Sequence, residues 1–376
     1  MSDRVNASPW WSFLRLRVRG LIVLVLLIGT GLGWIARGSR LQRDAVTAIQ
    51  KAGGSVQYAW EGPKWLAGLL GVDYFGHVVA VALAQRGSDA ELMLIADLSQ
   101  LEELKLEDSP VTDSGLAHLE GLTRLKRLDL SGTRVSDAGL ASLERMSLLE
   151  VVHLDRTTIS DDGLEHLKSL TGLLELSLAA TEVGDKGLEH LKGLTSLGEL
   201  SLANDKIAGD GLVCLSGLPR LRRLDLSGTR VGDPGLEHLK RLTSLLGLNL
   251  ARTPITDAAL IPLKGLVLLR ALNLEQTRVT DTGLAHLERW VSLEELSLAG
   301  TQVSDAGLAH LTGLTRLRML DLRDTRVDDR GLPSLRRLDS LRGLDLQHVL
   351  DLRNTAVTQA GVQELKKAMR PIPIRH

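Results

Sequence analysis

The sequence predicts an α/β solenoid with a parallel β-sheet on its concave side and short helices on its convex side, preceded by a transmembrane helix. The first observation is a leucine that recurs every 24 residues from Leu101 to Leu341 without a slip. The second is an apolar run at residues 20–36 that carries no charge. Internal periodicity of this length is typical of stacked repeats, and a long apolar run indicates a membrane span.

Composition favours a folded chain with two unlike parts. Of the 376 residues, 44% are apolar and 24% are charged, which is the balance of an ordered chain. All aromatic residues except Trp290 lie before residue 76, so the border between the parts falls near there. The net charge of −1 indicates no overall attraction to nucleic acid or to an anionic membrane. The single cysteine, Cys214, excludes an intrachain disulfide and a thiolate metal cluster.

Residues 1–19 form a short basic tail, and residues 20–36 (GLIVLVLLIGTGLGWIA) are expected to form a signal-anchor helix. Such a helix would be about 26 Å long, close to the thickness of a bilayer core. Arginines flank the run on both sides: Arg15, Arg17, Arg19, Arg37, Arg40 and Arg43. The alternative is a cleaved signal peptide, because Gly31 and Gly33 offer a weak cleavage site. The short basic tail favours a cytoplasmic N-terminus and an extracytoplasmic solenoid.

Residues 37–77 are expected to hold a juxtamembrane helix and an N-terminal cap. The helix is placed over residues 41–56, with Gly53-Gly54 as its stop signal. The open end of a solenoid core needs a cover. Large apolar side chains are predicted to supply it: Trp60, Trp65, Leu66, Leu69, Leu70, Tyr74 and Phe75. An aromatic ligand pocket is the alternative role for these residues.

Residues 78–366 are expected to form about twelve repeats. The spacing L-x-x-L-x-L places leucines such as Leu104 and Leu106 on one face of a strand and the residue between them on the other. The spacing of Leu140 and Leu143 in the second half of the unit indicates a short helix. One unit alone cannot bury its apolar face, so the units must stack. The first unit is degenerate and is built on Val78, Val81, Leu83, Leu92, Ile95 and Leu98.

Two polar columns accompany the leucines. Asp137 and its equivalents stand where the N-cap of each short helix belongs, and Gly209 replaces the aspartate in one unit, which is expected to be frayed. Thr133 and its equivalents end the strands. Their hydroxyls are expected to form a buried ladder that bonds to the turns of neighbouring coils.

The unit at residues 125–146, LKRLDLSGTRVSDAGLASLERM, resembles the leucine-rich-repeat family, with threonine where that family usually has asparagine or cysteine. The resemblance covers about residues 78–366. It implies a right-handed superhelix with the parallel sheet on the concave side. The chain is similar to bacterial single-pass, membrane-anchored members of the family, and similar D-x-G-L repeats occur in the F-box substrate receptors of ubiquitin ligases.

The last unit departs from the period. Thr355 follows Thr325 by 30 residues instead of 24, which indicates a six-residue insertion. The strand is placed at the LDL sequence that ends at Leu346, with a bulged loop after it. A capping helix is expected over residues 363–369, and residues 367–376 are assigned to a C-terminal tail.

The outward strand residues of the concave face are the candidate binding surface. Their column contains no aromatic residue, so contact with a partner is expected to be polar and sensitive to salt. Together with neighbouring basic residues, the predicted partner-binding set is Lys126, Asp129, His153, Arg222, Asp225, Asn249, Asn273, Arg318, Asp321 and Asp345.

Three members of this column recur at a spacing of 96 residues: Asp129, Asp225 and Asp321. Each has a basic residue three positions earlier. The favoured interpretation is duplication of a gene segment. The alternative is a binding patch repeated along the sheet for a periodic partner such as a polymer.

No catalytic, cofactor or metal site is predicted. Histidines share one column (His118, His166, His190, His238, His286 and His310), but their place on the outer helices favours ordinary surface residues over metal ligands. No G-x-S-x-G, P-loop or H-E-x-x-H sequence occurs. The asparagine of Asn6-Ala7-Ser8 fits a glycosylation acceptor but lies on the expected inner side.

The sequence therefore predicts a non-enzymatic, membrane-anchored interaction scaffold for a protein or glycan partner. Residues 20–36 would contact the lipid bilayer, and no nucleic-acid partner is expected. The alternative is an intracellular substrate-recognition adaptor of the F-box type. That alternative needs an F-box ahead of the repeats, where residues 1–76 hold an apolar span instead.

Overall fold

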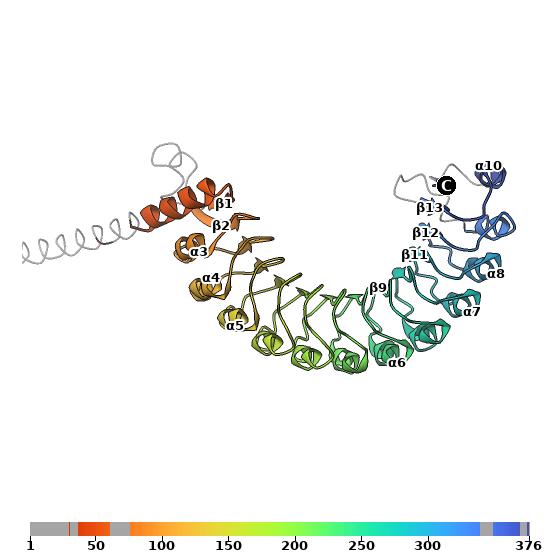
Figure 1. Ribbon diagram of the computed structural model, residues 1–376, viewed down its shortest axis with the longest axis horizontal. Coiled ribbons are helices and arrows are strands. Elements are labelled where there is room, and N and C mark those ends of the chain that lie inside the picture. Colours follow the sequence, from red (N-terminus) through yellow and green to blue (C-terminus); the bar gives the residue numbers. More distant parts are fainter. Residues whose placement is uncertain (1–29, 31–36, 61–75, 339–348, 369–373, 376) are drawn as a thin grey trace, which may run out of the picture.

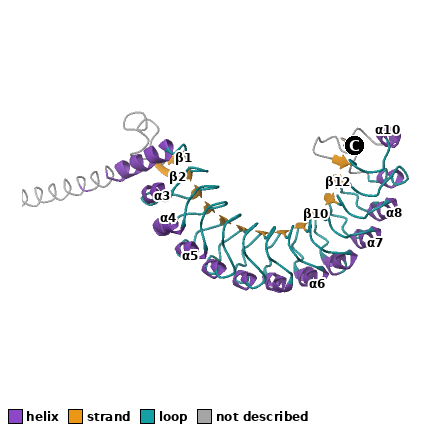
Figure 2. Ribbon diagram, viewed as in Figure 1, coloured by secondary structure: helices purple, strands orange, loops and turns teal. Residues whose placement is uncertain are grey.

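The computed structural model describes residue 30 and residues 37–60, 76–338, 349–368 and 374–375. These residues form an open arc of stacked coils (Figure 1). The strands line the concave side and the helices line the convex side (Figure 2). The predicted α/β solenoid is confirmed.

One sheet runs the length of the arc, and its strand order follows the sequence. β1 pairs antiparallel with β2, and each later pair is parallel. The register advances by one repeat per strand, so that Leu104 is the partner of Leu128. The strands are β1 (Ser55–Trp60), β2 (Gly76–Ala82), β3 (Glu103–Lys105), β4 (Arg127–Asp129), β5 (Val151–His153), β6 (Glu175–Ser177), β7 (Glu199–Ser201), β8 (Arg223–Asp225), β9 (Gly247–Asn249), β10 (Ala271–Asn273), β11 (Glu295–Ser297), β12 (Met319–Asp321), β13 (Val349–Asp351) and β14 (Ile374–Arg375).

The convex side consists of short α-helices and 3₁₀ helices. The α-helices are α3 (Asp89–Ile95), α4 (Asp113–Ala117), α5 (Asp137–Leu140), α6 (Asp233–Leu236), α7 (Asp281–Leu284), α8 (Asp305–Leu308), α9 (Leu332–Leu335) and α10 (Gln359–Ala368). The 3₁₀ helices are η2 (His118–Gly121), η3 (Ala141–Leu143), η4 (Gly163–Leu167), η5 (Gly187–Leu191), η6 (Asp210–Gly217), η7 (Glu237–Arg241), η8 (Asp257–Leu260), η9 (Pro262–Gly265), η10 (Ala285–Leu287) and η11 (Ala309–Leu311).

The core is a continuous spine of leucines between the sheet and the convex helices. Leu101, Leu104 and Leu106 are fully buried, as are their equivalents along the arc. Trp290 occupies a leucine position of this spine and is also fully buried. Each coil covers the core face of the next, so burial of apolar surface stabilises the stack rather than any single unit.

Aspartates join neighbouring coils along the strand-to-helix edge, which we define as the segments that lead from each strand to the next convex helix, such as residues 130–136. Asp113 is the first residue of α4 rather than its N-cap, so the predicted capping role is wrong. Its carboxylate accepts hydrogen bonds from the backbone N–H and the hydroxyl of Ser136 in the next coil, at 2.7 and 2.6 Å. The same pair of bonds joins Asp89 to Thr112, Asp137 to Ser160, Asp233 to Thr256, Asp257 to Thr280, Asp281 to Ser304 and Asp329 to Thr358.

The glycine of each D-x-G-L sequence lies against the aspartate of the preceding coil. A methyl group added to Gly139 would lie 2.4 Å from the Asp113 Oδ1 atom, and one added to Gly283 would lie 2.3 Å from the Asp257 Oδ1 atom. One coil, whose helical turn is η8, has Ala259 at this position. The absent side chain therefore makes room for the carboxylate that bridges the coils.

Except at Thr181, the threonine hydroxyls bond within their own coil, so the predicted ladder between coils is wrong. Thr133 donates its hydroxyl to the Leu130 carbonyl at 2.7 Å, and Thr277 donates to Leu274 in the same way. The carbonyl lies one residue past the end of the strand. The hydroxyl three residues later satisfies this buried acceptor.

Asp205 takes the threonine position in one coil and changes the pattern. It is almost fully buried, and its Oδ1 atom accepts bonds from the backbone N–H and the hydroxyl of Thr181, at 2.7 and 3.0 Å. Burial raises the pKa of the Asp205 carboxyl to about 7, although the bonds from Thr181 act against this rise. Its Oδ2 atom has no hydrogen-bond partner within the described chain. This carboxylate is a local weakness in the spine.

The coil with Gly209 is not frayed as predicted. It forms η6, which spans eight residues. Gly209 has a φ of +126°, a backbone conformation that L side chains rarely adopt. Asp185 of the preceding coil accepts backbone N–H bonds from Ala208, Gly209 and Gly211. This turn is therefore held by three hydrogen bonds to one carboxylate, whereas most of the other coils have two.

The N-terminal end of the core is covered by a helix over residues 37–51 and by β1. Ala45 and Ile49 of this helix are fully buried in the core. The helix predicted over residues 41–56 therefore begins and ends earlier, and residues 55–56 belong to β1. It ends before Gly53, which has the left-handed φ of +79° expected of a stop signal. Of the residues predicted to plug the core, Trp60 ends β1 and is partly buried, and those from Trp65 to Phe75 lie outside the described residues. Tyr58 of β1, which was not predicted to do so, packs against the core.

The predicted anchor at residues 20–36 lies outside the described residues, apart from Thr30. In the part of the chain that the structure describes, no helix has the length and apolar character needed to cross a bilayer.

The last repeat was predicted in the wrong register. Leu350 in β13, not Leu344, is the partner of Leu320 in β12. The turn after the strand explains why the second LDL sequence forms the strand. As in most of the other coils, the threonine hydroxyl, here that of Thr355, donates to the carbonyl three residues earlier, here that of Leu352, at 2.6 Å. The insertion therefore precedes the strand, in residues 339–348, which are not described. Asp345 falls among them, and Asp351 takes its place in the column.

The C-terminal cap also differs from the prediction. α10 begins at Gln359, four residues before the expected start at residue 363. The predicted tail is not wholly separate from the solenoid. Its residues Ile374–Arg375 form β14, which pairs parallel with β13.

Candidate binding surface

The concave face presents two outward columns that flank the buried leucine of each strand. The second column was the predicted one, and it includes Asp129, His153 and Asn249. The first column begins each strand and includes Arg223 and Gly247. Because side chains alternate along a strand, both neighbours of a core leucine such as Leu248 face outward.

The aspartates and asparagines of the second column have a structural role, because their side chains bond to the backbone of the following turn. The Asp225 Oδ1 atom accepts the backbone N–H of Ser227 at 2.8 Å. The Asn249 Oδ1 atom accepts the N–H of Ala251 at 3.1 Å. The same bond, to the N–H two residues on, is made by Asp129, Asn273, Asp321 and Asp351. Each of these side chains closes the turn after its strand and has only its remaining polar atoms free for a partner.

His153 links three strands near the N-terminal third of the sheet. Its Nε2 atom lies 3.0 Å from the Glu175 Oε1 atom, and its Nδ1 atom lies 3.8 Å from the Asp129 Oδ2 atom. Asp129 and then Glu175 raise the pKa of His153 to about 9. Burial alone would raise the pKa of Asp129, but His153 and Ser131 outweigh it and hold that pKa well below its ordinary value. An imidazolium between two carboxylates is therefore the form present at neutral pH.

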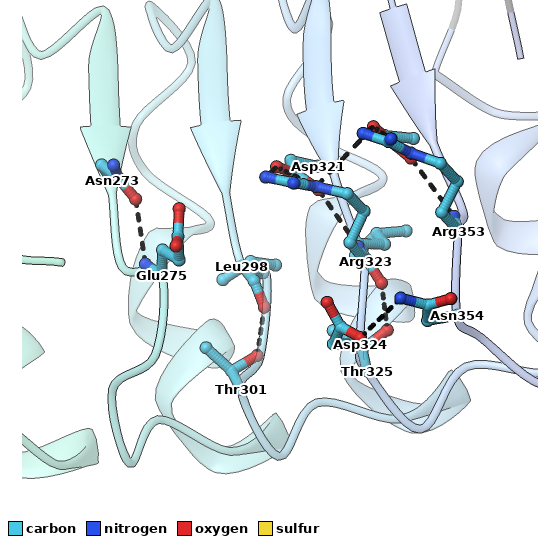
Figure 3. A network of polar contacts seen from close by, with 12 residues as sticks. Asn273, Glu275, Leu298, Thr301, Asp321, Arg323, Asp324, Thr325, Arg353 and Asn354 are labelled. Carbon is cyan, nitrogen blue, oxygen red and sulfur yellow. Dashed lines mark hydrogen bonds and ion pairs between the residues drawn. The ribbon is translucent and has the colours of Figure 1, made fainter. Parts of the chain in front are cut away.

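A second charged cluster lies at the C-terminal end of the face (Figure 3). Arg323 forms a bidentate ion pair with Asp321, in which the Nη2–Oδ2 distance is 2.6 Å. Arg353 makes the same arrangement with Asp351 at 2.8 Å. Arg323 also lies 3.7 Å from Asp351, so the two pairs form one chain of alternating charges across β12 and β13.

Between these clusters the face is hollowed into a trough of about 610 Å³. Small residues form its middle, where Gly247 and Ala271 stand in the first column. Met319 lines one end and is 40% exposed. The Ser297 hydroxyl in the lining is buried and has no hydrogen-bond partner within the described chain. The trough thus combines small side chains, a few aliphatic contacts and charged residues such as Arg223 and Glu295.

Half of the predicted partner-binding residues line the trough. They are His153, Asp225, Asn249, Asn273 and Asp321. Lys126, Asp129, Arg222 and Arg318 lie outside its lining, and Asp345 is not described. The prediction missed the first column, including Glu199, Arg223 and Glu295. Alternation along the strand, applied to both neighbours of each core leucine, would have found them.

The 96-residue repeat does not produce three equal patches. Asp129 faces His153, Asp225 accepts a bond from the Asn249 amide at 2.9 Å, and Asp321 holds Arg323. Two of the basic residues pair with a glutamate of the preceding coil: Lys126 with Glu102 at 2.8 Å and Arg318 with Glu294 at 3.6 Å. Within the described chain, no ion pair joins these basic residues to the aspartates. This favours duplication over a repeated binding patch.

The histidine column lies on the convex side and is not gathered into a site. His166 bonds to Glu144 at 2.7 Å, and His310 bonds to Glu288 at 2.9 Å, each across one coil. Over the described ranges, no group of three or more histidine, cysteine, aspartate or glutamate residues could hold a metal ion.

The sheet, spine and convex turns define a solenoid built from leucine-rich units. The family model for the leucine-rich repeat matches residues 122–143 and 218–240. This chain is a leucine-rich-repeat protein. No curated protein matches it in a sequence comparison.

Solved structures share the fold. An internalin of Listeria monocytogenes is 22% identical, with a TM-score of 0.59, over 79% of this chain and 86% of that one. A leucine-rich-repeat protein of Leptospira interrogans is 16% identical, with a TM-score of 0.50, over 76% of this chain and 80% of that one. At identities this low, the comparisons show a shared fold and no more.

Proposed function

We propose that this protein is a membrane-anchored, non-catalytic scaffold whose concave trough binds an extended segment of a protein partner. The leucine-rich-repeat fold supports a role in protein interaction. The observation that carries the proposal is the trough, which crosses the sheet from His153 to Asp321. At a strand spacing of ~4.8 Å, it is on the order of 30 Å long, enough for roughly ten extended residues.

The chemistry of the trough favours a polypeptide over a glycan. No aromatic residue lines it to stack against sugar rings. Gly247 and Ala271 leave space for a backbone to approach the sheet. Charged walls such as Arg223 and Glu295 would select the partner's side chains and orient it.

A photo-crosslinking residue tests the binding face. Placed at Ala271 in the trough, it should capture a discrete protein partner from native membranes. The same residue at Ala309, which is exposed on the convex side, serves as the control. Ala271→Arg, which fills the trough, should abolish co-purification of that partner. Equal capture from both positions would contradict the proposal.

The membrane anchor rests on sequence. Residues 20–36 carry no charge and are flanked by arginines, as expected of a single-pass anchor with the solenoid on the extracytoplasmic side. Recovery of the chain in carbonate-washed membranes, and cleavage of the solenoid by protease added to intact cells, would support this arrangement. A fully soluble pool would contradict the anchor, and protection from the protease would reverse the orientation.

A further inference from the structure

The second edge of the arc carries a charge pattern unrelated to the trough. We define the helix-to-strand edge as the end of each convex helix together with the segment that leads from it to the next strand, such as residues 120–126 from η2 to β4. Because the coils stack in register, equivalent residues of these segments form rows along the arc. Figure 1 views the molecule down its shortest axis, so it looks onto a broad side of the arc. The rows lie along one of the two broad sides.

Unpaired cations dominate this edge. The exposed residues on it that have no ion-pair partner among the described residues include Arg145, Arg220, Arg241, Lys264, Arg289 and Arg316. By contrast, Lys168, Lys192 and Lys240 each bond to a glutamate three residues earlier.

Acidic residues are fewer on this edge. They are Asp97, Glu102, Glu120, Glu144, Glu150, Glu288 and Glu294. Four of them are already paired: Glu102 with Lys126, Glu144 with His166, Glu288 with His310 and Glu294 with Arg318. The net charge of −1 therefore conceals a strongly cationic side.

Aliphatic side chains are exposed among these cations. Val267 and Leu268 are 47% and 51% exposed, and Val291, one coil further on, is 53% exposed. Lys264 and Arg289 lie in the same two coils. Exposed aliphatic residues within a cationic surface are typical of proteins that lie on anionic membranes, because the cations attract headgroups while the aliphatic groups enter the acyl boundary.

We propose that the helix-to-strand edge docks on an anionic lipid bilayer, with Val267, Leu268 and Val291 as its apolar contact. Charge complementarity argues for the negative partner, and the aliphatic patch argues for lipid over a soluble polyanion. A nucleic acid would gain from aromatic stacking. On the described part of the chain beyond residue 76, the sole aromatic side chain is the buried Trp290. Docking would lay the arc flat and leave the trough open to the side.

The test compares the two edges of the full chain on vesicles. In a Cys214→Ser background, an environment-sensitive fluorophore is attached through Thr243→Cys on the helix-to-strand edge or through Thr282→Cys at the start of α7, which adjoins the strand-to-helix edge. Both positions are exposed. The vesicles contain phosphatidylcholine with brominated acyl chains, with or without phosphatidylglycerol. Quenching reports contact with lipid at each edge, whether or not another segment also anchors the chain.

Quenching should be strong at position 243 and weak at position 282, and only when phosphatidylglycerol is present. High salt should remove it, because it screens surface charge. Each Lys or Arg near an anionic surface is worth ~1 kcal/mol, roughly fivefold in binding. The triple variant Arg220→Gln, Arg241→Gln and Arg289→Gln should therefore lower the docked-to-free ratio on the order of a hundredfold.

The matched control removes three exposed arginines from the opposite edge: Arg230→Gln, Arg278→Gln and Arg326→Gln. It changes the net charge equally and should leave quenching unchanged. Leu268→Ser should reduce quenching without changing its salt dependence. Equal quenching at both positions, or equal loss in both triple variants, would overturn the proposal. Binding of heparin or duplex DNA by this edge without vesicle contact would assign it to a soluble polyanion instead.

Discussion

The two edges of the arc come from the same 24-residue unit but use their polar groups differently. On the strand-to-helix edge, Asp113 and its equivalents bond to the next coil, and glycines such as Gly139 make room for them. On the helix-to-strand edge, cations such as Arg220 face solvent, and a methyl group added to Gly265 would meet nothing within 4 Å. One edge holds the coils together, and the other is free to vary and to bind.

The largest expected effect comes from removing one bridging aspartate. Asp281→Ala leaves the backbone N–H and the hydroxyl of Ser304 without their charged acceptor. Hydrogen bonds to charged groups contribute ~1.5–3 kcal/mol each, so unfolding should become easier by about 3 kcal/mol. Urea unfolding measures the shift. Glu288→Ala on the opposite edge is the control and should cost less than about 0.5 kcal/mol. Similar costs for both would end the distinction between the edges.

The strand-to-helix edge is least stable at Asp205, whose buried carboxylate has an oxygen without a hydrogen-bond partner in the described chain. Its folded pKa of about 7 lies above the ordinary 3.8, so it removes stability as the pH rises from about 4 to 7. Asp205→Thr restores the residue of the other coils and should stabilise the protein by about 2 kcal/mol at pH 8. The gain should shrink at pH 4. Thermal unfolding at both pH values checks this, and a gain independent of pH would show that the carboxylate is not the cause.

Glycine substitutions compare the same change on both edges. Gly283→Ala places a methyl group 2.3 Å from the Asp257 carboxylate and should cost about 1–2 kcal/mol. The existence of Ala259 in one coil argues for the lower part of this range. Gly265→Ala meets no neighbour and should be neutral or slightly stabilising. Equal midpoints of urea unfolding for the two variants would contradict the close packing of glycine and aspartate.

The smallest effect concerns His153 on the concave face. Its pKa is raised from 6.5 to about 9, so its pairing with Asp129 and Glu175 contributes fully below pH 6.5 and is lost as the pH rises through 9. The imidazole is part-exposed, so the contribution should stay below about 1 kcal/mol. His153→Gln should remove this decline between pH 6.5 and pH 9. A wild-type curve that is flat over this range would refute the imidazolium bridge.

The fold was predictable because the leucine period is strong and local. The spacing of Leu101, Leu104 and Leu106 fixes which side chains are buried, and stacking follows. The exact role of polar residues was not predictable in this way. Asp113 and Thr133 are both compatible with bonds inside a coil or between coils, and only the three-dimensional register shows that aspartate makes the second kind and threonine the first.

Repeated sequence also misled the prediction. The LDL sequences at Leu344 and Leu350 fit the strand equally well, and the turn that leads to Thr355 decides for the second. The trough was half predicted, since the column of Asn249 was considered and the column of Gly247 was not. The cationic edge was hidden because a net charge of −1 averages over the two sides of the molecule.

Amide hydrogen exchange of the unmodified protein, resolved along the chain, would distinguish the bridged edge from the unbridged one. The bridged amides of Ser136, Thr280 and Ser304 should be strongly protected, because carboxylates of the preceding coil accept their N–H groups at 2.7 Å. The amides of Leu148, Leu268 and Ser292 on the helix-to-strand edge should exchange freely. Equal protection on both edges would contradict the account.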